Sequence, residues 1–229
     1  MSDKMISKAR GDLPSPLAIS LKNISKSFGF VKANKDVCLS VAPGTIHGIV
    51  GENGAGKSTL VSVLYGFYSA DSGKVSVFGD PVRLRSSADA IAVGIGMVHQ
   101  HFMLVPNFTV LENIILGHEG GADLRAGARQ AEASLKDISE RYGLSVDLQA
   151  VVQDLPVGLQ QRVEILKALY RGARILILDE PTGVLTPQET EQLFDILRTL
   201  KAQGVTILLI THKLKEIMAV TDFVSVMRS

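Results

Sequence analysis

The segment Gly51–Thr59 constrains the fold of this chain more than any other part of the sequence. It reads Gly-Glu-Asn-Gly-Ala-Gly-Lys-Ser-Thr, the pattern of a phosphate-binding loop between a strand and a helix. The apolar run Thr45–Val50 predicts the strand, and Leu60–Leu64 has apolar residues at helical spacing. Glycines let backbone N–H groups turn toward phosphate oxygens, and the positive end of the helix points at the same anion. The candidate phosphate-binding residues are therefore Gly51, Asn53, Gly54, Ala55, Gly56, Lys57, Ser58 and Thr59.

A second segment, Ile175–Glu180, carries carboxylates that fit beside such a loop. Its four apolar residues predict a central strand, and Asp179 and Glu180 stand at the carboxyl end, where open α/β sheets bind ligands. In this setting Lys57 is expected to reach the β- and γ-phosphates and Ser58 to ligate Mg²⁺. Asp179 is expected to hold the same ion through water, and Glu180 to polarise the attacking water. The two segments together predict a site for a polyphosphate and Mg²⁺.

Strands alternate with helices along the chain, and most of the strands are apolar throughout. This predicts a mostly parallel sheet covered by helices on both faces. The sequence between Val110 and Ala168 is helical in character and is expected to be an insert in the core. Thr186 is expected to cap a helix that Gly204 closes. The expected strands are Ala18–Leu21, Val37–Val41, Thr45–Val50, Lys74–Phe78, Ile95–Val98, Arg174–Leu178, Val205–Ile210 and Phe223–Met227, with turns at Asn34–Asp36, Pro43–Gly44 and Asp71–Gly73 and helices at Ala128–Tyr142, Gln160–Tyr170 and Pro187–Ala202.

Composition narrows the class of protein further. A chain of 229 residues that is 46% hydrophobic can bury one substantial core, with at most a small satellite subdomain. Its net charge of +1 gives no electrostatic argument for binding nucleic acid or an anionic membrane surface. No apolar run approaches the ~20 residues that cross a bilayer. The only cysteine, Cys38, excludes an internal disulfide and is expected to be a small buried hydrophobe, and the polar residues 1–16 are expected to form a flexible tail.

With these motifs in order, residues 18–227 resemble the ATP-binding cassette family of transporter ATPases. The resemblance implies that Phe28 stacks on adenine, although a core aromatic remains the alternative for this residue. It implies that Gln100 contacts Mg²⁺ and the attacking water and responds to the membrane partner. It implies that His212, in Thr-His-Lys, contacts the γ-phosphate. His99 and His101 flank Gln100, but no carboxylate or cysteine cluster accompanies them, which argues against a zinc site.

The departures from the family pattern fall in one region. The signature Leu-Ser-Gly-Gly-Gln is replaced by Leu155-Pro-Val-Gly-Leu159, which lacks the serine that would contact the γ-phosphate on an opposite cassette. Pro156 also lacks a backbone N–H. The segment Gly183–Thr186 stands where Ser-Ala-Leu-Asp is usual, so Thr186 replaces a carboxylate. The site formed by the chain's own residues is therefore predicted to be intact. The contribution that the chain makes to the site of a partner cassette is predicted to be weak.

This combination resembles the N-terminal cassette of the tandem ATPases of simple-sugar and nucleoside importers. The stretch Gly96–Pro106 most resembles the nucleoside branch. The resemblance implies an α/β P-loop NTPase core of the RecA-like type, with a small antiparallel β subdomain. Residues 17–229 would form one nucleotide-binding domain, with a helical subdomain at about 102–168. Because Phe223–Met227 would normally pair with a following strand, the chain is expected to be a cassette excised from a longer polypeptide.

The expected function is ATP binding and hydrolysis that power solute import, of sugar or nucleoside type. The implied partners are a second cassette in the same full-length chain and transmembrane permease subunits, at the cytoplasmic face of the inner membrane, with no nucleic acid. A DNA-maintenance ATPase is disfavoured because about a hundred residues without heptads separate the phosphate loop from the signature. A small-molecule kinase would not explain Gln100 and His212 together. A non-hydrolysing regulatory cassette is opposed by Glu180, but the altered signature keeps it open.

Overall fold

The structure is a computed structural model that describes residues 6–7, 16–100, 102–117 and 124–228. Its larger sheet has the order β1-β10-β4-β9-β8-β7, and all neighbouring pairs are parallel except β1 with β10. This confirms the mostly parallel sheet predicted from the apolar strands. The strands are β1 (Ile6–Ser7), β4 (Ile46–Gly51), β7 (Ile95–Val98), β8 (Ile175–Asp179), β9 (Thr206–Ile210) and β10 (Phe223–Met227).

Part of the expected N-terminal tail takes a place in this sheet. Ile6 and Ser7 form β1, which pairs antiparallel with β10. Residues 1–5 and 8–15 lie outside the described residues. The edge of β10 that was expected to pair with a following strand is therefore met, at these positions, by residues from the start of the chain.

The smaller sheet is antiparallel, with the order β3-β2-β5-β6. It consists of β2 (Ile19–Phe28), β3 (Val31–Val41), β5 (Ser72–Val77) and β6 (Asp80–Val82). The expected turn at Asn34–Asp36 is wrong, because β3 runs through these residues and the chain reverses at Gly29, whose φ is +58°. Asp36 has a φ of +50°, and the register with β2 shifts beside it. The turn-forming residues mark a β-bulge, which favours the same backbone conformation as a turn.

Cys38 is exposed, so the prediction that it is a small buried hydrophobe is wrong. Its neighbours Leu39 and Val41 on β3 lie in the core, at 2% and 0% exposure. Side chains alternate across a strand, which places Cys38 on the face opposite Leu39. There its Sγ accepts a hydrogen bond from the backbone N–H of Asn23, at 3.3 Å.

The central strands divide their side chains between two cores. Ile175 and Ile177 of β8 pack with the small sheet and α1 (Lys57–Leu64), whereas Leu176 and Leu178 pack with α5 (Val157–Tyr170) and α6 (Pro187–Ala202). All four are fully buried. The alternation explains why the strand is apolar at every position, since helices or strands cover both of its faces.

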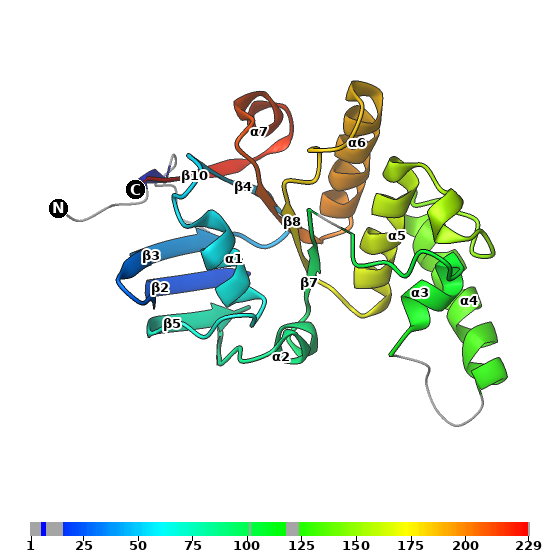
Figure 1. Cartoon of the computed structure of the whole chain (residues 1–229), viewed down its shortest axis with the longest axis horizontal. Helices are drawn as coiled ribbons and strands as arrows, with labels where there is room; N and C mark the ends of the chain where they lie inside the picture. Colours follow the sequence, from blue (N-terminus) through cyan, green and yellow to red (C-terminus); the bar gives the residue numbers. More distant parts are fainter. Residues whose placement is uncertain (1–5, 8–15, 101, 118–123, 229) are drawn as a thin grey trace.

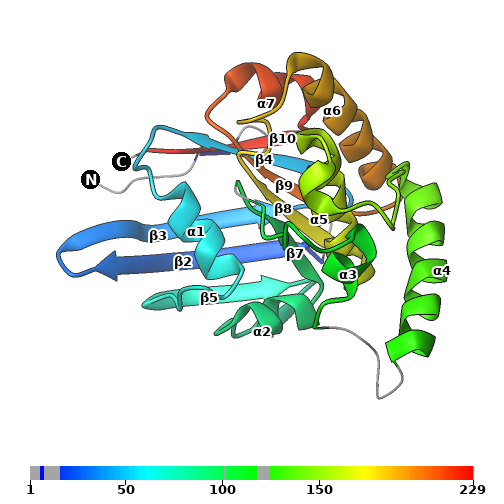
Figure 2. The same ribbon diagram turned by 45° about the vertical axis from the view of Figure 1, so that its right-hand side comes forward.

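The helices between β7 and β8 gather at one end of the molecule, away from the antiparallel sheet (Figures 1 and 2). They are α3 (Val110–Ile115), α4 (Leu124–Tyr142), the short 3₁₀ helix η1 (Val152–Asp154) and α5. Two further helices are α2 (Ser87–Ala92) and α7 (Leu214–Val220). Among the helices of the described residues, none has both the length and the apolarity that a bilayer span requires.

The ends of α6 confirm the predicted caps. The Thr186 hydroxyl accepts the Glu189 N–H at 3.3 Å, and the Glu189 carboxylate accepts the Thr186 N–H at 2.9 Å, which is a capping box. At the other end Gly204 has a φ of +87° and donates to Lys201. These are local signals, because every contact is within one turn of the helix end.

Candidate nucleotide-binding site

The predicted site residues follow the carboxyl ends of three neighbouring strands. In the sheet register, Ile210 at the end of β9 lies opposite both Ile49 of β4 and Asp179 of β8. The chain segments beyond these positions therefore emerge at the same level of the sheet. They carry the phosphate loop, Glu180 and His212, so the sheet brings together groups that are far apart in the sequence.

The phosphate loop needs glycine at two positions because of their backbone conformation, and at one of them also because of a close neighbour. Gly54 and Gly56 have φ values of +86° and +84°, which favour glycine. A Cβ on Gly56 would also collide with the carbonyl oxygen of Ala33 on β3. The side-chain amide of Asn34, which is 4% exposed, donates to the Gly56 carbonyl at 3.1 Å. Sequence reasoning missed this contact because Asn34 was assigned to a turn.

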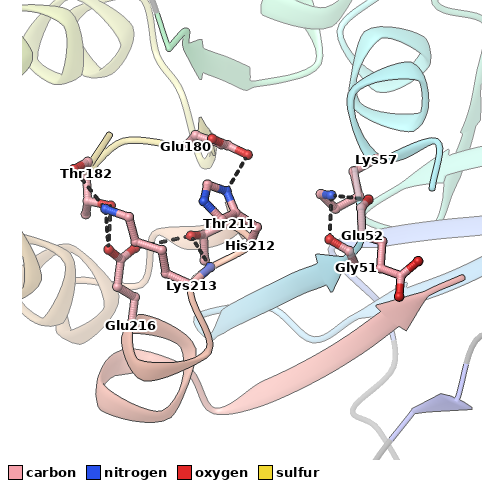
Figure 3. Close-up of polar contacts among 9 residues, drawn as sticks. All are labelled: Gly51, Glu52, Lys57, Glu180, Thr182, Thr211, His212, Lys213 and Glu216. Carbon is pink, nitrogen blue, oxygen red and sulfur yellow. Dashed lines mark hydrogen bonds and ion pairs between the residues drawn. The ribbon is translucent and has the colours of Figure 1, made fainter. Parts of the chain in front are cut away.

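Lys57 begins α1 and is only 6% exposed. Its ammonium donates to the carbonyl oxygens of Gly51 and Glu52, at 2.7 and 2.8 Å (Figure 3). No side chain caps this helix, whose N-cap is Gly56. Asn53 and Ser58 are exposed, Thr59 is half-buried and Ala55 is buried. The loop thus presents backbone N–H groups and a cation at the start of a helix, which suits a polyphosphate.

Asp179 and Glu180 stand side by side at the end of β8. Burial raises the pKa of the Asp179 carboxyl, the charge of Glu180 raises it further, and Lys57 opposes both. Glu180 has a φ of +47°, an uncommon backbone conformation for a residue of this kind. Its N–H donates to the Ile210 carbonyl at 2.9 Å, which ties the strained residue to β9.

The Glu180 carboxylate is paired with His212, the histidine expected to contact the γ-phosphate. Its Oε1 lies 3.0 Å from Nδ1 of His212, and the histidine side chain is 50% exposed. Figure 3 shows this pair on one side of the site and Lys57 on the other. A carboxylate and an imidazole within hydrogen-bond distance can orient water and exchange a proton with it.

Gln100 is exposed and follows β7, and α5 holds the backbone shortly after it. Glu164 accepts the Met103 N–H at 2.7 Å, and Lys167 donates to the Met103 carbonyl at 3.1 Å. Burial raises the pKa of the Glu164 carboxyl, with Lys167 opposing the shift. This clamp joins the segment of Gln100 to the helix that begins at the signature, and sequence reasoning did not find it.

A cavity of about 270 Å³ lies beside the clamp. Aromatic and polar side chains share its wall, among them Tyr65, Phe67, His99, Met103, Glu164 and Lys167. Burial lowers the pKa of His99, and the charge of Lys167 lowers it further. The described residues hold no group of three or more metal-ligating side chains, and His101 lies outside them.

Phe28 ends β2 with a ring that is partly accessible. It is 42% exposed and meets the edge of Tyr68, with ring centroids 5.0 Å apart. Lys26 lies 5.5 Å from the centroid of the ring. The exposed face fits stacking against a flat heterocycle.

The signature segment begins α5 without a hydroxyl cap. Pro156 is the N-cap and makes no side-chain hydrogen bond. The Gly158 N–H donates instead to Oε1 of Glu189, at 3.3 Å. Because Glu189 belongs to the capping box of α6, one carboxylate serves the N-termini of two helices.

Comparison with known proteins identifies the family to which the chain is related. The sequence pattern of the family described as ABC transporter matches residues 34–183. The chain is 51% identical to a nucleoside import ATP-binding protein of Lactococcus lactis subsp. cremoris, over 92% of this chain and 42% of that protein. It is 48% identical to a glucose import ATP-binding protein of Haloferax volcanii, over 92% of this chain and 43% of that protein. It therefore spans less than half the length of these relatives.

A solved structure shows the same fold. It is an ATP-binding cassette of an ABC transporter in its ADP conformation, with a TM-score of 0.82 and 30% sequence identity. The match covers 93% of this chain and 88% of that one. The α/β core, the antiparallel sheet and the helical region therefore form the cassette architecture that the motifs predicted.

Proposed function

The chain belongs to the ABC transporter family, and we propose that it binds and hydrolyses ATP to power the import of a sugar or a nucleoside. The observation that carries the proposal is the alignment of three strand ends around one site, with Lys57, Asp179, Glu180 and His212 beyond them. The names of the relatives, which import nucleosides and glucose, support the two classes of solute.

In this proposal the phosphate loop binds ATP, and Glu180 and His212 on the opposite side of the site carry out its hydrolysis. The loop N–H groups and the Lys57 ammonium hold the β- and γ-phosphates. Glu180 accepts the proton of the attacking water, and the 3.0 Å contact with His212 orients its carboxylate. His212 in turn faces the terminal phosphate, and Phe28 supports the adenine ring.

The donor set fits Mg²⁺. Ser58 offers an exposed hydroxyl in the first turn of α1, Asp179 a carboxylate and Gln100 an amide oxygen, and hard divalent cations prefer oxygen ligands. When bound, the ion would neutralise charge that develops on the phosphates. Asp179 would then have a partner of opposite charge, and Glu180 would stay free to accept the proton of the attacking water.

The proposed partners are permease subunits and a second cassette. The cavity between Tyr65 and Lys167 joins apolar, aromatic and charged groups near Gln100, which suits a helix of a membrane protein. This would place the chain peripherally at the cytoplasmic face of the membrane. A weakly hydrolysing cassette is the second candidate, because Pro156 stands where the signature usually has serine and the Glu189 carboxylate accepts the nearby Gly158 N–H.

The test is solute uptake by proteoliposomes that contain the assembled transporter. We expect ATP hydrolysis coupled to uptake of one member of a panel of pentoses, hexoses and nucleosides. Isolated chain should bind Mg·ATP and turn it over slowly, because its own signature lacks a hydroxyl donor. Turnover without uptake of any panel member would contradict the import assignment, and no nucleotide binding would contradict the site itself.

A further inference from the structure

The Glu216 side chain lies buried under the two loops that carry Glu180 and His212. Glu216 belongs to the first turn of α7 and is 8% exposed. Buried carboxylates are rare unless hydrogen bonds or an ion pair satisfy them. None of the motifs that predict the nucleotide site includes this residue, and it does not face the phosphate loop in Figure 3.

Each oxygen of Glu216 accepts a hydrogen bond from a different loop. Oε1 accepts the hydroxyl of Thr182 at 2.6 Å, and Oε2 accepts the hydroxyl of Thr211 at 3.2 Å. Both threonines are buried, at 2% and 1% exposure. Thr182 lies just beyond Glu180, and Thr211 immediately precedes His212. One carboxylate therefore bridges the loop after β8 and the loop after β9.

Lys213 closes the network on the other side of His212. Its ammonium lies 3.1 Å from Oε1 of Glu216 and donates to the Thr182 carbonyl at 3.2 Å. Its backbone N–H donates to the Thr211 hydroxyl at 3.0 Å. The residues on both sides of His212 are thus fixed to the Glu216 carboxylate (Figure 3).

We propose that Glu216 is a positioning residue that sets the distance between Glu180 and His212 during ATP hydrolysis. The proposal rests on the hydrolytic function proposed above. Half of the His212 side chain is exposed, so packing around the ring does not determine where it lies. The position of the ring therefore depends on how the backbone on either side of His212 is held. Glu180 has a strained φ of +47°, which persists only where the surroundings determine it. A bridge between the two loops supplies that constraint.

A carboxylate is the group that this bridge needs. Two hydroxyls donate to it at once, so it must offer an acceptor on each oxygen, and the adjacent ammonium neutralises its charge. Glu216→Gln keeps the shape but replaces one acceptor by a donor and removes the ion pair. The two loops would then remain folded, but their positions relative to each other would no longer be fixed by the bridge.

The experiment measures hydrolysis by the assembled transporter with Glu216→Gln, with Lys215→Ala as the matched control. Lys215 is exposed on the same helix. We expect kcat to fall about tenfold with the KM for ATP within about twofold, since only the transition-state arrangement changes. Lys215→Ala should change neither. A rise in KM equal to the fall in kcat/KM would overturn the proposal, because it would show that Glu216 supports nucleotide binding.

A double-mutant cycle separates positioning from general stabilisation. If Glu216 acts through the Glu180–His212 pair, Glu216→Gln should have almost no further effect on kcat in a His212→Ala background. Multiplicative effects would overturn the proposal. Thr211→Val is a second variant that removes the hydroxyl bond to Glu216 on the side of His212 together with the acceptor of the Lys213 N–H, and it should also lower kcat with unchanged KM.

The same data distinguish the two proposals. If neither Glu180→Gln nor His212→Ala reduces hydrolysis, the proposed function of the site fails. If both reduce it and Glu216→Gln does not, the site stands and only the positioning role is lost.

Discussion

Two helices of this cassette begin with different chemistry at the end where a phosphate would bind. The helix α1 starts at Gly56 in a left-handed conformation, with no side chain over its first N–H groups. The helix α5 starts at Pro156, and the Glu189 carboxylate accepts the N–H of Gly158. The N-terminus of a helix attracts anions through its free N–H groups and its dipole. One terminus keeps that capacity for a ligand, and the other uses part of it on the protein's own carboxylate.

The difference between the two helix ends corresponds to the two roles expected of a cassette that pairs with another one, namely to bind its own nucleotide and to complete the site of its partner. In the proposed function, the α1 side serves the nucleotide bound by this chain, together with Glu180 and His212. The signature side is expected to serve a nucleotide on a partner cassette. An open α1 with an occupied α5 thus supports a cassette that completes its own site better than its partner's.

The largest expected effect comes from Glu180→Gln, which tests the α1 side. The amide keeps the size and the hydrogen bond to His212 but cannot accept the proton of the attacking water. We expect single-turnover hydrolysis to fall by about a thousandfold or more with ATP affinity nearly unchanged. Rapid-quench assays of the assembled transporter give the rate, and titration with a fluorescent ATP analogue gives the affinity. Residual hydrolysis at the normal rate would assign catalysis to the other cassette.

Lys57→Ala should weaken the binding of ATP, and this effect should be the second largest. The change removes the buried ammonium that we propose contacts the phosphates, and also its two hydrogen bonds to the carbonyls of Gly51 and Glu52. A charge-assisted hydrogen bond contributes about 1.5–3 kcal/mol, so ATP affinity should fall by about 10- to 100-fold. Isothermal titration measures it, with Lys215→Ala as the control. Equal loss of affinity in Glu180→Gln and Lys57→Ala would contradict the division of roles.

Pro156→Ser with Val157→Gly tests the signature side. The serine restores a hydroxyl donor, and the glycine permits closer approach of the backbone. In a tandem protein whose own site is silenced by Lys57→Ala, single-turnover hydrolysis at the partner's site should rise by about tenfold. The same double change with Lys57 intact should leave the first site unaffected. A gain at the first site would mean that the signature serves this chain's own nucleotide.

How far the sequence predicted the site depended on the distance between interacting residues. The placement of Lys57, Asp179 and Glu180 at one edge of the sheet was predictable because each belongs to a contiguous motif with a strand beside it. The Thr186 cap and the strand Ile95–Val98 were also predicted, since both depend on local signals.

Contacts between distant segments were not found. Asn34 binds the phosphate loop, Glu164 holds Met103, and Glu216 joins two loops, and in each case the partner lies in another element. Asp36 was misassigned because a bulge and a turn use the same left-handed conformation. Cys38 was misassigned because its residue type was weighed without the alternation of β3.

Asp179 predicts a smaller, pH-dependent effect at the α1 side. Its pKa is raised mainly by burial and then by Glu180, so on acidification it takes up a proton earlier than an ordinary aspartate and loses its value as a ligand. Mg²⁺-dependent ATP affinity should therefore weaken on acidification, beginning at a higher pH than an ordinary aspartate would cause. In Glu180→Gln the charge that raises the pKa of Asp179 further is absent, so the loss of affinity should begin at a lower pH. At one fixed acidic pH, this variant should bind Mg·ATP about threefold more tightly than the unchanged chain does. An unchanged profile would show that Asp179 does not control Mg²⁺ binding.

Glu189→Gln should have the smallest effect, and it tests the α5 terminus directly. The single amide oxygen can accept either the Gly158 N–H or the Thr186 N–H, so one of these contacts is lost together with the negative charge that would repel a partner's γ-phosphate. In a Glu180→Gln background, where ATP is bound but not hydrolysed, ATP-dependent closure of the two cassettes should tighten by about twofold. Thr186→Ala is the matched control, because it removes the other half of the capping box and costs about 1 kcal/mol of stability while the carboxylate stays at α5. Sedimentation velocity at several ATP concentrations measures closure, and thermal unfolding measures stability. Tighter closure with Glu189→Gln but not with Thr186→Ala would attribute the effect to charge, whereas equal changes in both would attribute it to the loss of the cap.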